Sequence, residues 1–254
     1  MVRLSRSKAT ATSNESLSLM GLIRYWFSFA VITSWYGAIM TVAGLLKVKQ
    51  RKGGIFDRSA RGWGASLLRW NGIRVEVEGR ERLRGDRPCI YVANHVSFVD
   101  IWAMVKEMPD TVRFVSKKEL FRVPAMGQAM KAAGHISIDR KNHAAAFAMY
   151  DEAAVMVREG TSAVVFPEGT RSWEGTLMPF KKGPFVLAIK AQVPVVPVHI
   201  HGTFNIMRRG SRYPRKGVIR LVPGAEIPTE GLTFDDRDVL SRRTREALQA
   251  LAAG

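Results

Sequence analysis

The chain divides near residue 72 into two regions with different patterns of apolar and polar positions. From residue 25 to residue 46 no side chain is charged, whereas after residue 72 short β-branched runs alternate with helical patterns. The β-branched runs predict strands at 73–79, 89–94, 112–116, 135–139, 162–166, 193–200 and 218–224. Helices are predicted near 97–108, 124–133, 142–159, 183–191 and 235–252. This alternation predicts an α/β domain with a mixed, largely parallel sheet flanked by helices.

The uncharged run at 25–46 is typical of a membrane segment. As a helix it would be roughly 33 Å long, enough to cross a hydrocarbon core of about 30 Å. Basic residues concentrate after it, between Lys47 and Arg61, so a spanning helix would leave the rest of the chain in the cytoplasm. An interfacial helical hairpin is the second geometry, because serine, threonine and glycine dilute the run and Trp35 and Tyr36 lie near its middle.

The next segment, 57–72, suits either a membrane surface or the domain that follows. Trp63, Leu67 and Trp70 share one helical face, and three arginines add positive charge. That face could lie in a membrane interface or pack on the domain, and the spacing leaves both open. We therefore expect a polar tail at 1–16, a membrane-associated helical segment at 17–71 and the α/β domain at 72–254.

Charge and cysteine content narrow the possible partners. The 39 basic and 22 acidic side chains give a net charge of +17, which favours anionic membrane lipid, phosphorylated small molecules or nucleic acid. Nucleic acid is not expected, because the chain has no helix-turn-helix signature, RNP motif or zinc-ligand spacing. The single cysteine, Cys89, excludes an intramolecular disulfide, and its apolar surroundings predict a buried structural thiol.

Polar clusters follow three of the predicted strands. NHVSFVD (94–100), DRKN (139–142) and PEGTRS (167–172) each begin where a strand ends. Ligands of open α/β sheets gather at the carboxyl ends of strands, so we expect these clusters to converge on one site.

The pair His95 and Asp100 permits two interpretations. Residues five apart in a regular helix point about 140° away from each other, so contact requires His95 in a turn and Asp100 in the first helical turn, with Ser97 as N-cap. Neutral histidine could then take a proton from an alcohol while the carboxylate orients the ring. Alternatively, Ser97 and Asp100 form only a helix cap. No GxSxG nucleophile elbow is present, so the alcohol is expected to be a substrate's.

The segment FPEGTRS (166–172) is suited to an anion. A glycine-containing turn, two hydroxyls and the guanidinium of Arg171 could bind a phosphate or an oxyanion. Arg140 could add a second charge, and lysines at 117, 118, 181 and 182 are further cations, although each could be a solvated surface charge. Glu168 could form a local ion pair with Arg171.

In this order the motifs resemble those of the 1-acylglycerol-3-phosphate O-acyltransferase (lysophosphatidic acid acyltransferase) family. NHVSFVD is similar to its His-x4-Asp motif, GHISIDR (134–140) to its second block, and FPEGTRS to its Pro-Glu-Gly-Thr-Arg motif. VPVVPV (193–198) matches the apolar fourth block. The departures are His135 and Ser137, which replace apolar residues in the second block.

The resemblance implies an acyltransferase of phospholipid biosynthesis. It would move a fatty acyl group from acyl-CoA or acyl-carrier protein to the sn-2 hydroxyl of lysophosphatidic acid, giving phosphatidic acid. His95 would be the general base and Asp100 would orient it. Alternatives are another lysolipid acceptor, such as lyso-ornithine lipid, or a non-catalytic basic membrane-binding protein.

The resemblance also implies a substrate-binding set, no metal and no cofactor. The implied substrate-binding residues are Arg140, Glu168, Gly169, Thr170 and Arg171, with Asn94 and Lys118 as possible additions. The expected location is the cytoplasmic face of the inner membrane.

Overall fold

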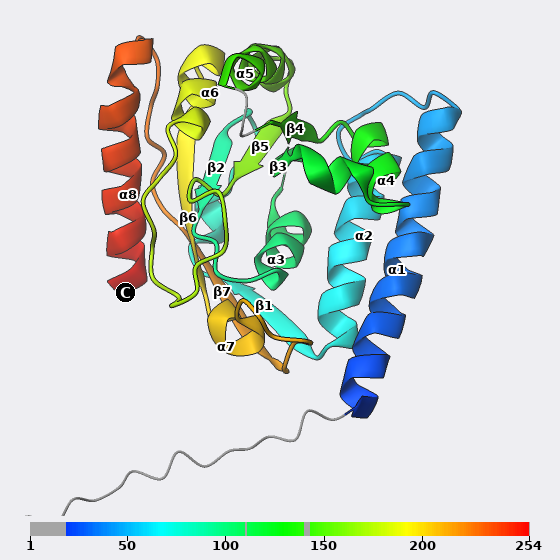
Figure 1. The fold of residues 1–254 in the computed structure, drawn as a ribbon. Coiled ribbons are helices and arrows are strands. Elements are labelled where there is room, and N and C mark those ends of the chain that lie inside the picture. The colour runs from blue at the N-terminus through cyan, green and yellow to red at the C-terminus, as the bar shows by residue number, and fades with distance from the viewer. Residues whose placement is uncertain (1–18, 110, 140–142, 254) are drawn as a thin grey trace, which may run out of the picture.

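The computed structural model describes residues 19–109, 111–139 and 143–253, which form a sheet flanked by helices (Figure 1). The seven strands are β1 (Ile73–Val77), β2 (Ile90–Ala93), β3 (Val112–Lys117), β4 (Ile136–Ile138), β5 (Ser162–Val165), β6 (Val195–His201) and β7 (Gly217–Pro223). Their order across the sheet is β1-β7-β6-β2-β5-β3-β4. Every pairing is parallel except β6 with β7, so the sheet is mixed and largely parallel, as predicted.

Helices connect and cover these strands. The α-helices are α1 (Leu19–Leu45), α2 (Ile55–Trp70), α3 (Val99–Glu107), α4 (Met126–Ala132), α5 (His143–Arg158), α6 (Gly183–Ala191), α7 (Thr203–Met207) and α8 (Arg237–Ala253). Three short 3-10 helices are η1 (Arg80–Arg82), η2 (Lys118–Arg122) and η3 (Phe234–Asp236).

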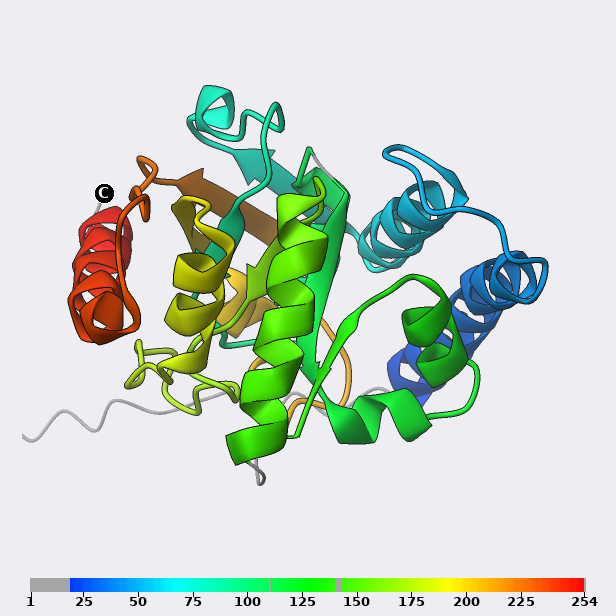
Figure 2. The same cartoon turned by 90° about the horizontal axis from the view of Figure 1, so that it is seen from above.

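Two apolar layers enclose the sheet. One contains α2 and α3 and is centred on Trp102, which is fully buried. The other contains α5, α6 and α8, with Leu240 and Leu248 fully buried. Figure 2 shows α5, α6 and α8 separated by the sheet from α1 and α2. Because β2 is covered on both faces, all four of its residues are buried, and this explains its continuous apolar run. Cys89, just before β2, is 5 % exposed, which confirms the predicted buried thiol.

The uncharged N-terminal run forms a single helix, α1, long and apolar enough to cross a membrane by length and composition. It lies beside α2 and α4 (Figure 1). Trp63 of α2 donates a hydrogen bond from Nε1 to Oγ1 of Thr33 at 3.0 Å. Trp26, Phe27 and Trp35 are exposed on other sides of α1. The helix therefore presents one side to the domain and an apolar surface to the surroundings.

Packing on the domain accounts for most of α2. Leu67 is fully buried and Trp63 packs against the same core, as the packing alternative predicted. Trp70 is 52 % exposed, so the packing alternative holds for Trp63 and Leu67 but not for the third residue of that face. The close approach of α2 to α3 occurs at Gly64, where an added Cβ would lie 2.8 Å from the carbonyl oxygen of Trp102.

A buried ion pair joins α2 to β3. Asp57 Oδ1 accepts a hydrogen bond from Nη1 of Arg113 at 3.0 Å, and the two side chains are 3 % and 2 % exposed. Asp57 Oδ2 also accepts hydrogen bonds from the hydroxyl of Thr111 and from the amide of Gly53. The carboxylate is thus well compensated in a place where an unpaired charge would be costly.

The element boundaries confirm the seven predicted strands and five predicted domain helices to within about two residues. Helix α7 was not predicted, because a single turn of five residues carries no periodic signal. It begins after Gly202, whose φ of 86° and whose close approach to the carbonyl oxygen of Val218 both require glycine.

Candidate active site

The loops after β2 and β5 emerge at the same edge of the sheet. The two strands are parallel neighbours, and they end at Ala93 and Val165. The segments 94–98 and 166–172 therefore start side by side, as expected for polar clusters at carboxyl ends. A direct contact joins them, because the amide of Ser172 donates a hydrogen bond to the carbonyl oxygen of His95 at 2.9 Å.

His95 and Asp100 are in contact. His95 Nδ1 lies 2.9 Å from Asp100 Oδ2, with His95 in the turn before α3 and Asp100 in its first turn. The Asp100 side chain is completely buried, and Oδ2 also accepts hydrogen bonds from the amides of Val96 at 2.9 Å and Ser97 at 2.8 Å. The carboxylate favours the tautomer with hydrogen on Nδ1, which leaves Nε2 as the basic atom.

The helix start differs from the prediction by one residue. Phe98 occupies the N-cap position, and α3 begins at Val99. Ser97 does not act as the N-cap, because it is bound to the segment after β6. Its hydroxyl donates a hydrogen bond to the carbonyl oxygen of Met207 at 2.6 Å, and its backbone forms an isolated β-bridge with Arg208. The same hydroxyl accepts a weaker hydrogen bond from the amide of Val99 at 3.3 Å. Asp100 Oδ2 accepts from the amides of Val96 and Ser97, which precede the N-cap, so one carboxylate holds both the chain before the helix and the His95 ring.

The His95 ring is supported from one face and open at one nitrogen. It stacks on Phe166, with ring centroids 4.0 Å apart and planes inclined by 16°. Its side chain is 14 % exposed, and Nε2 forms no hydrogen bond within the described part of the chain. An alcohol can therefore reach the basic nitrogen, while Phe166 and Asp100 fix the ring plane.

Glu168 holds the backbone of the histidine turn. Its Oε1 accepts a hydrogen bond from the amide of His95 at 2.7 Å, and its Oε2 accepts one from the amide of Met178 at 2.9 Å. Burial raises the pKa of Glu168, and the two amides oppose that shift. An ion pair with Arg171 does not form among the described residues, so this alternative for Glu168 is wrong. Sequence reasoning placed Glu168 at the site without finding its link to His95.

Arg171 brings positive charge to the site. Burial lowers its pKa, and the neighbouring charge of Arg209 lowers it further, whereas Asp100 acts in the opposite direction. Gly169 precedes it with a φ of 74°, which lets the loop turn tightly after Pro167. The hydroxyl of Thr170 lies 3.4 Å from Nη1 of Arg209. Arg209 was missed from the sequence because it follows β6 and α7, outside the three clusters.

Three other predicted site residues have different outcomes. Arg140 lies outside the described residues. Lys118 forms an ion pair with Asp139, and within the described residues it makes no hydrogen bond to His95 or to 167–172. Asn94 uses both polar atoms of its amide on Ile200, with distances of 2.7 and 3.0 Å, and so ties the end of β2 to β6. Asn94 is buried in this structural role.

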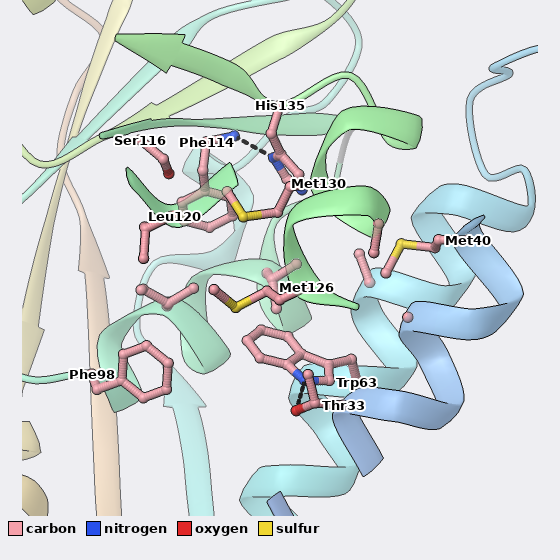
Figure 3. A pocket seen from close by; sticks show the side chains of 15 residues that line it. Thr33, Met40, Trp63, Phe98, Phe114, Ser116, Leu120, Met126, Met130 and His135 are labelled. Carbon is pink, nitrogen blue, oxygen red and sulfur yellow. Dashed lines mark hydrogen bonds between the residues drawn. The ribbon is translucent and has the colours of Figure 1, made fainter. Parts of the chain in front are cut away.

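An apolar cavity of about 110 Å³ has Phe98, the residue before α3, in its lining (Figure 3). It is lined from α1, α2, α3, α4 and β3, and Phe98 lies at the α3 side while His135 lies opposite. His135 Nδ1 accepts a hydrogen bond from the amide of Phe114 at 2.9 Å. Burial lowers the pKa of His135 to about 3, with a further contribution from Arg113. The cavity is thus lined mainly by apolar side chains and an imidazole kept neutral.

Comparison with known proteins shows the family of this chain. The family model described as Acyltransferase matches residues 74–201. The human 1-acyl-sn-glycerol-3-phosphate acyltransferase alpha is 37 % identical over 70 % of this chain, and the human beta enzyme is 32 % identical over 92 %. These alignments span 63 % of the alpha and 86 % of the beta protein. The chain therefore belongs to the acyltransferase family, as the four sequence blocks predicted.

A solved structure extends the similarity to nearly the whole chain. The crystal structure of the 1-acyl-sn-glycerophosphate (LPA) acyltransferase PlsC from Thermotoga maritima has a TM-score of 0.76 and 26 % identity. The match covers 93 % of this chain and 96 % of that one. The shared architecture therefore includes most of the N-terminal helices as well as the sheet.

Proposed function

We propose that this protein transfers a fatty acyl group from an acyl-CoA or acyl-carrier-protein thioester to the sn-2 hydroxyl of 1-acylglycerol-3-phosphate, producing phosphatidic acid. The observation that carries the proposal is the contact of His95 Nδ1 with the buried carboxylate of Asp100, which leaves Nε2 available. The relatives named as 1-acyl-sn-glycerol-3-phosphate acyltransferases support the choice of acceptor.

In the proposed reaction, Nε2 of His95 takes the proton of the acceptor hydroxyl as its oxygen attacks the thioester carbonyl carbon. Asp100 stabilises the imidazolium that forms. The tetrahedral intermediate collapses, the carbon–sulfur bond breaks, and the thiolate leaves with the proton that His95 returns. One ester and one thiol are formed from one alcohol and one thioester, with no covalent acyl-enzyme.

The surroundings of His95 suit the two ends of an amphipathic lipid. Arg171 supplies positive charge for the acceptor phosphate, and Arg140 is the second residue we assign to it. The apolar cavity that begins at Phe98 suits a fatty acyl chain, since its lining is mainly apolar. Glu168 ties its loop to the histidine turn, and Gly169 and Thr170, which follow it, are the residues we assign to the shape of the pocket.

The membrane association is proposed to be interfacial, at the cytoplasmic face of the inner membrane. One side of α1 packs along α2 and α4, while Trp26, Phe27 and Trp35 remain exposed. A helix held against a folded domain in this way suits the headgroup region, where amphipathic aromatic side chains are favoured. This would place the site where a lysolipid acceptor resides.

The test is acyl transfer by the full-length protein in mixed micelles. Thiol release from acyl-CoA or acyl-carrier protein is followed with lysophosphatidic acid and with a panel of lysolipids, including lyso-ornithine lipid. We expect lysophosphatidic acid to be acylated and His95→Ala to lose about 10³-fold or more in kcat. His201→Ala, at a part-buried histidine on β6, serves as the control and should retain activity.

Two results would contradict the proposal. Turnover of His95→Ala near the wild-type level would exclude the general-base role. A wild-type protein that binds vesicles but releases no thiol with any lysolipid would indicate a non-catalytic membrane protein. If another lysolipid is acylated faster, the proposed acyl transfer stands, but its acceptor is that lysolipid.

A further inference from the structure

Arg209 lies against the loop that contains Arg171. Its Nη1 donates a hydrogen bond to the carbonyl oxygen of Arg171 at 3.0 Å, and its guanidinium stacks over the ring of Trp173 at 4.3 Å. Because Ser172 is hydrogen-bonded to His95, only this loop separates Arg209 from the histidine turn. Trp173 and Arg171 together fix the orientation of the Arg209 guanidinium.

The adjoining segment is anchored independently to the histidine turn. Arg208 forms a backbone bridge with Ser97, whose hydroxyl is bonded to the carbonyl oxygen of Met207. The position of Arg209 is therefore set from two sides, by the turn after β2 and by the loop after β5. Such preorganisation is typical of a binding group and unusual for a solvated surface arginine.

The charge of Arg209 acts on the Arg171 guanidinium more strongly than the opposite charge of Asp100 does. Within the described part of the chain, neither Arg171 nor Arg209 forms an ion pair with a carboxylate. Nε and Nη2 of Arg209 make no hydrogen bond there either. Like charges placed close together destabilise each other, and the repulsion between Arg171 and Arg209 would be relieved by a bound anion.

We propose that Arg209 is a substrate-binding residue which, together with Arg171, holds the phosphate of the acyl acceptor beside His95. This inference rests on the proposed function and names a residue for its phosphate site. Only four covalent bonds separate the sn-2 oxygen of the acceptor from its phosphorus. A hydroxyl at His95 Nε2 therefore requires the phosphate to lie close by, whereas the phosphates of the acyl donor lie a whole phosphopantetheine arm away from the reacting carbonyl.

The experiment compares Arg209→Gln and Arg209→Lys with Arg212→Gln in the full-length, detergent-solubilised protein. Arg212 is an exposed arginine of the same loop, so its substitution makes the same change in net charge. Each variant is assayed with lysophosphatidic acid and with 1-monoacylglycerol, which has the hydroxyl but no phosphate. KM is measured separately for acceptor and donor.

We expect Arg209→Gln to raise KM for lysophosphatidic acid by about tenfold or more, as for loss of one charge-assisted contact. Turnover of 1-monoacylglycerol and KM for the donor should stay within about twofold of wild type, and Arg209→Lys should be intermediate because lysine retains charge without the planar fork. Arg212→Gln should behave as wild type. Equal losses with both acceptors would indicate a structural role and overturn the inference, and a rise in donor KM instead would assign the phosphate to the donor.

A second measurement does not depend on turnover. Inorganic phosphate or sn-glycerol 3-phosphate should raise the Tm of the wild type and of Arg212→Gln by mass action, and should raise that of Arg209→Gln less. Equal Tm shifts in all three proteins would overturn the role of Arg209. Absence of lysophosphatidic acid turnover by the wild type would instead count against the proposed function, and the Tm comparison would still decide whether Arg209 binds phosphate.

Discussion

His95 and Asp100 are joined through the one carboxylate oxygen that also binds the backbone just before helix α3. Oδ2 of Asp100 accepts hydrogen bonds from His95 Nδ1 and from the amides of Val96 and Ser97, all at 2.8 to 2.9 Å. The imidazole and the backbone of its turn are thus held by the same atom. Any change at Asp100 acts on the ring and on the turn together.

Asp100→Asn should abolish most of the activity. The amide group cannot stabilise an imidazolium, and its NH2 group favours the wrong tautomer of His95. We expect kcat to fall by about 10³- to 10⁴-fold, with a smaller change in KM for either substrate. Thiol release provides the measurement, and circular dichroism establishes that the variant is folded. A folded variant within tenfold of wild-type kcat would show that Asp100 does not orient a catalytic base.

Glu168→Gln should reduce activity through the position of His95. Glutamine has one accepting oxygen where glutamate has two, so the amide of His95 or Met178 loses its partner, at a cost of about 1–3 kcal/mol. Displacement of the turn should lower kcat by about 10- to 100-fold. Glu174→Gln, at an exposed position of the same loop, is the matched control. Similar kinetics for the two variants would contradict this role for Glu168.

Asp57→Asn should destabilise the protein strongly. It leaves the buried guanidinium of Arg113 without its ion-pair partner, and such losses cost about 3–5 kcal/mol. Arg80→Gln breaks the ion pair of Arg80 with Glu107. Because the Arg80 side chain is 60 % exposed, this change should lower the free energy of unfolding by no more than about 1 kcal/mol. Denaturant unfolding in detergent measures both free energies. Equal losses of unfolding free energy in the two variants would show that the buried Asp57–Arg113 pair contributes no more to stability than an exposed pair.

His135 should make the protein less stable as pH falls below neutrality. Its folded-state pKa is about 3 against an ordinary 6.5, so between these values the unfolded chain binds a proton that the folded protein does not. Stability is therefore complete above pH 6.5 and falls by up to about 1.4 kcal/mol per unit as pH drops toward 3. In His135→Asn the amide oxygen can replace Nδ1 as acceptor for Phe114, and the slope should become shallower. Thermal unfolding between pH 7 and 5 measures it, and an unchanged slope would exclude His135 as the source.

Met126→Trp should shorten the acyl chains that the protein accepts. Met126 projects into the apolar cavity (Figure 3), and a larger side chain there would occupy space proposed for the distal part of the chain. The preference for long over short acyl donors should fall by about tenfold or more. Met130→Leu, a nearly volume-conserving change in the same lining, is the control. An unaltered chain-length profile would place the acyl chain elsewhere.

The prediction of the sheet succeeded where each strand contains its own signal. The run from Cys89 to Ala93 is apolar throughout because β2 is covered on both faces, and the resulting pattern is independent of any partner. The exposure of Trp70 could not be predicted, because it depends on a partner. Helical periodicity placed it with Leu67, but whether a helical face is covered at its last turn depends on what lies opposite.

Some features of the candidate site could likewise be predicted from the sequence, and others could not. The spacing of His95 and Asp100 restricted their geometry to a turn followed by a helix, since no regular helix could bring them together. The positions of Ser97, Glu168 and Arg209 depend on contacts that span 38 to 110 residues of sequence, to Met207, His95 and the loop after β5. No local pattern encodes such contacts.

The sequence by itself determined the order of strands and helices along the chain, the family and the candidate pair of His95 and Asp100, because periodicity and short motifs are properties of neighbouring residues. The tertiary structure decided which oxygen of Asp100 is used, how Glu168 supports the turn, and that Arg209 lies beside Arg171. These depend on β2, β5 and β6 lying side by side in an order different from that along the chain. Hydrogen bonds reach only a few ångströms, so their partners are defined only when folding has brought distant segments together.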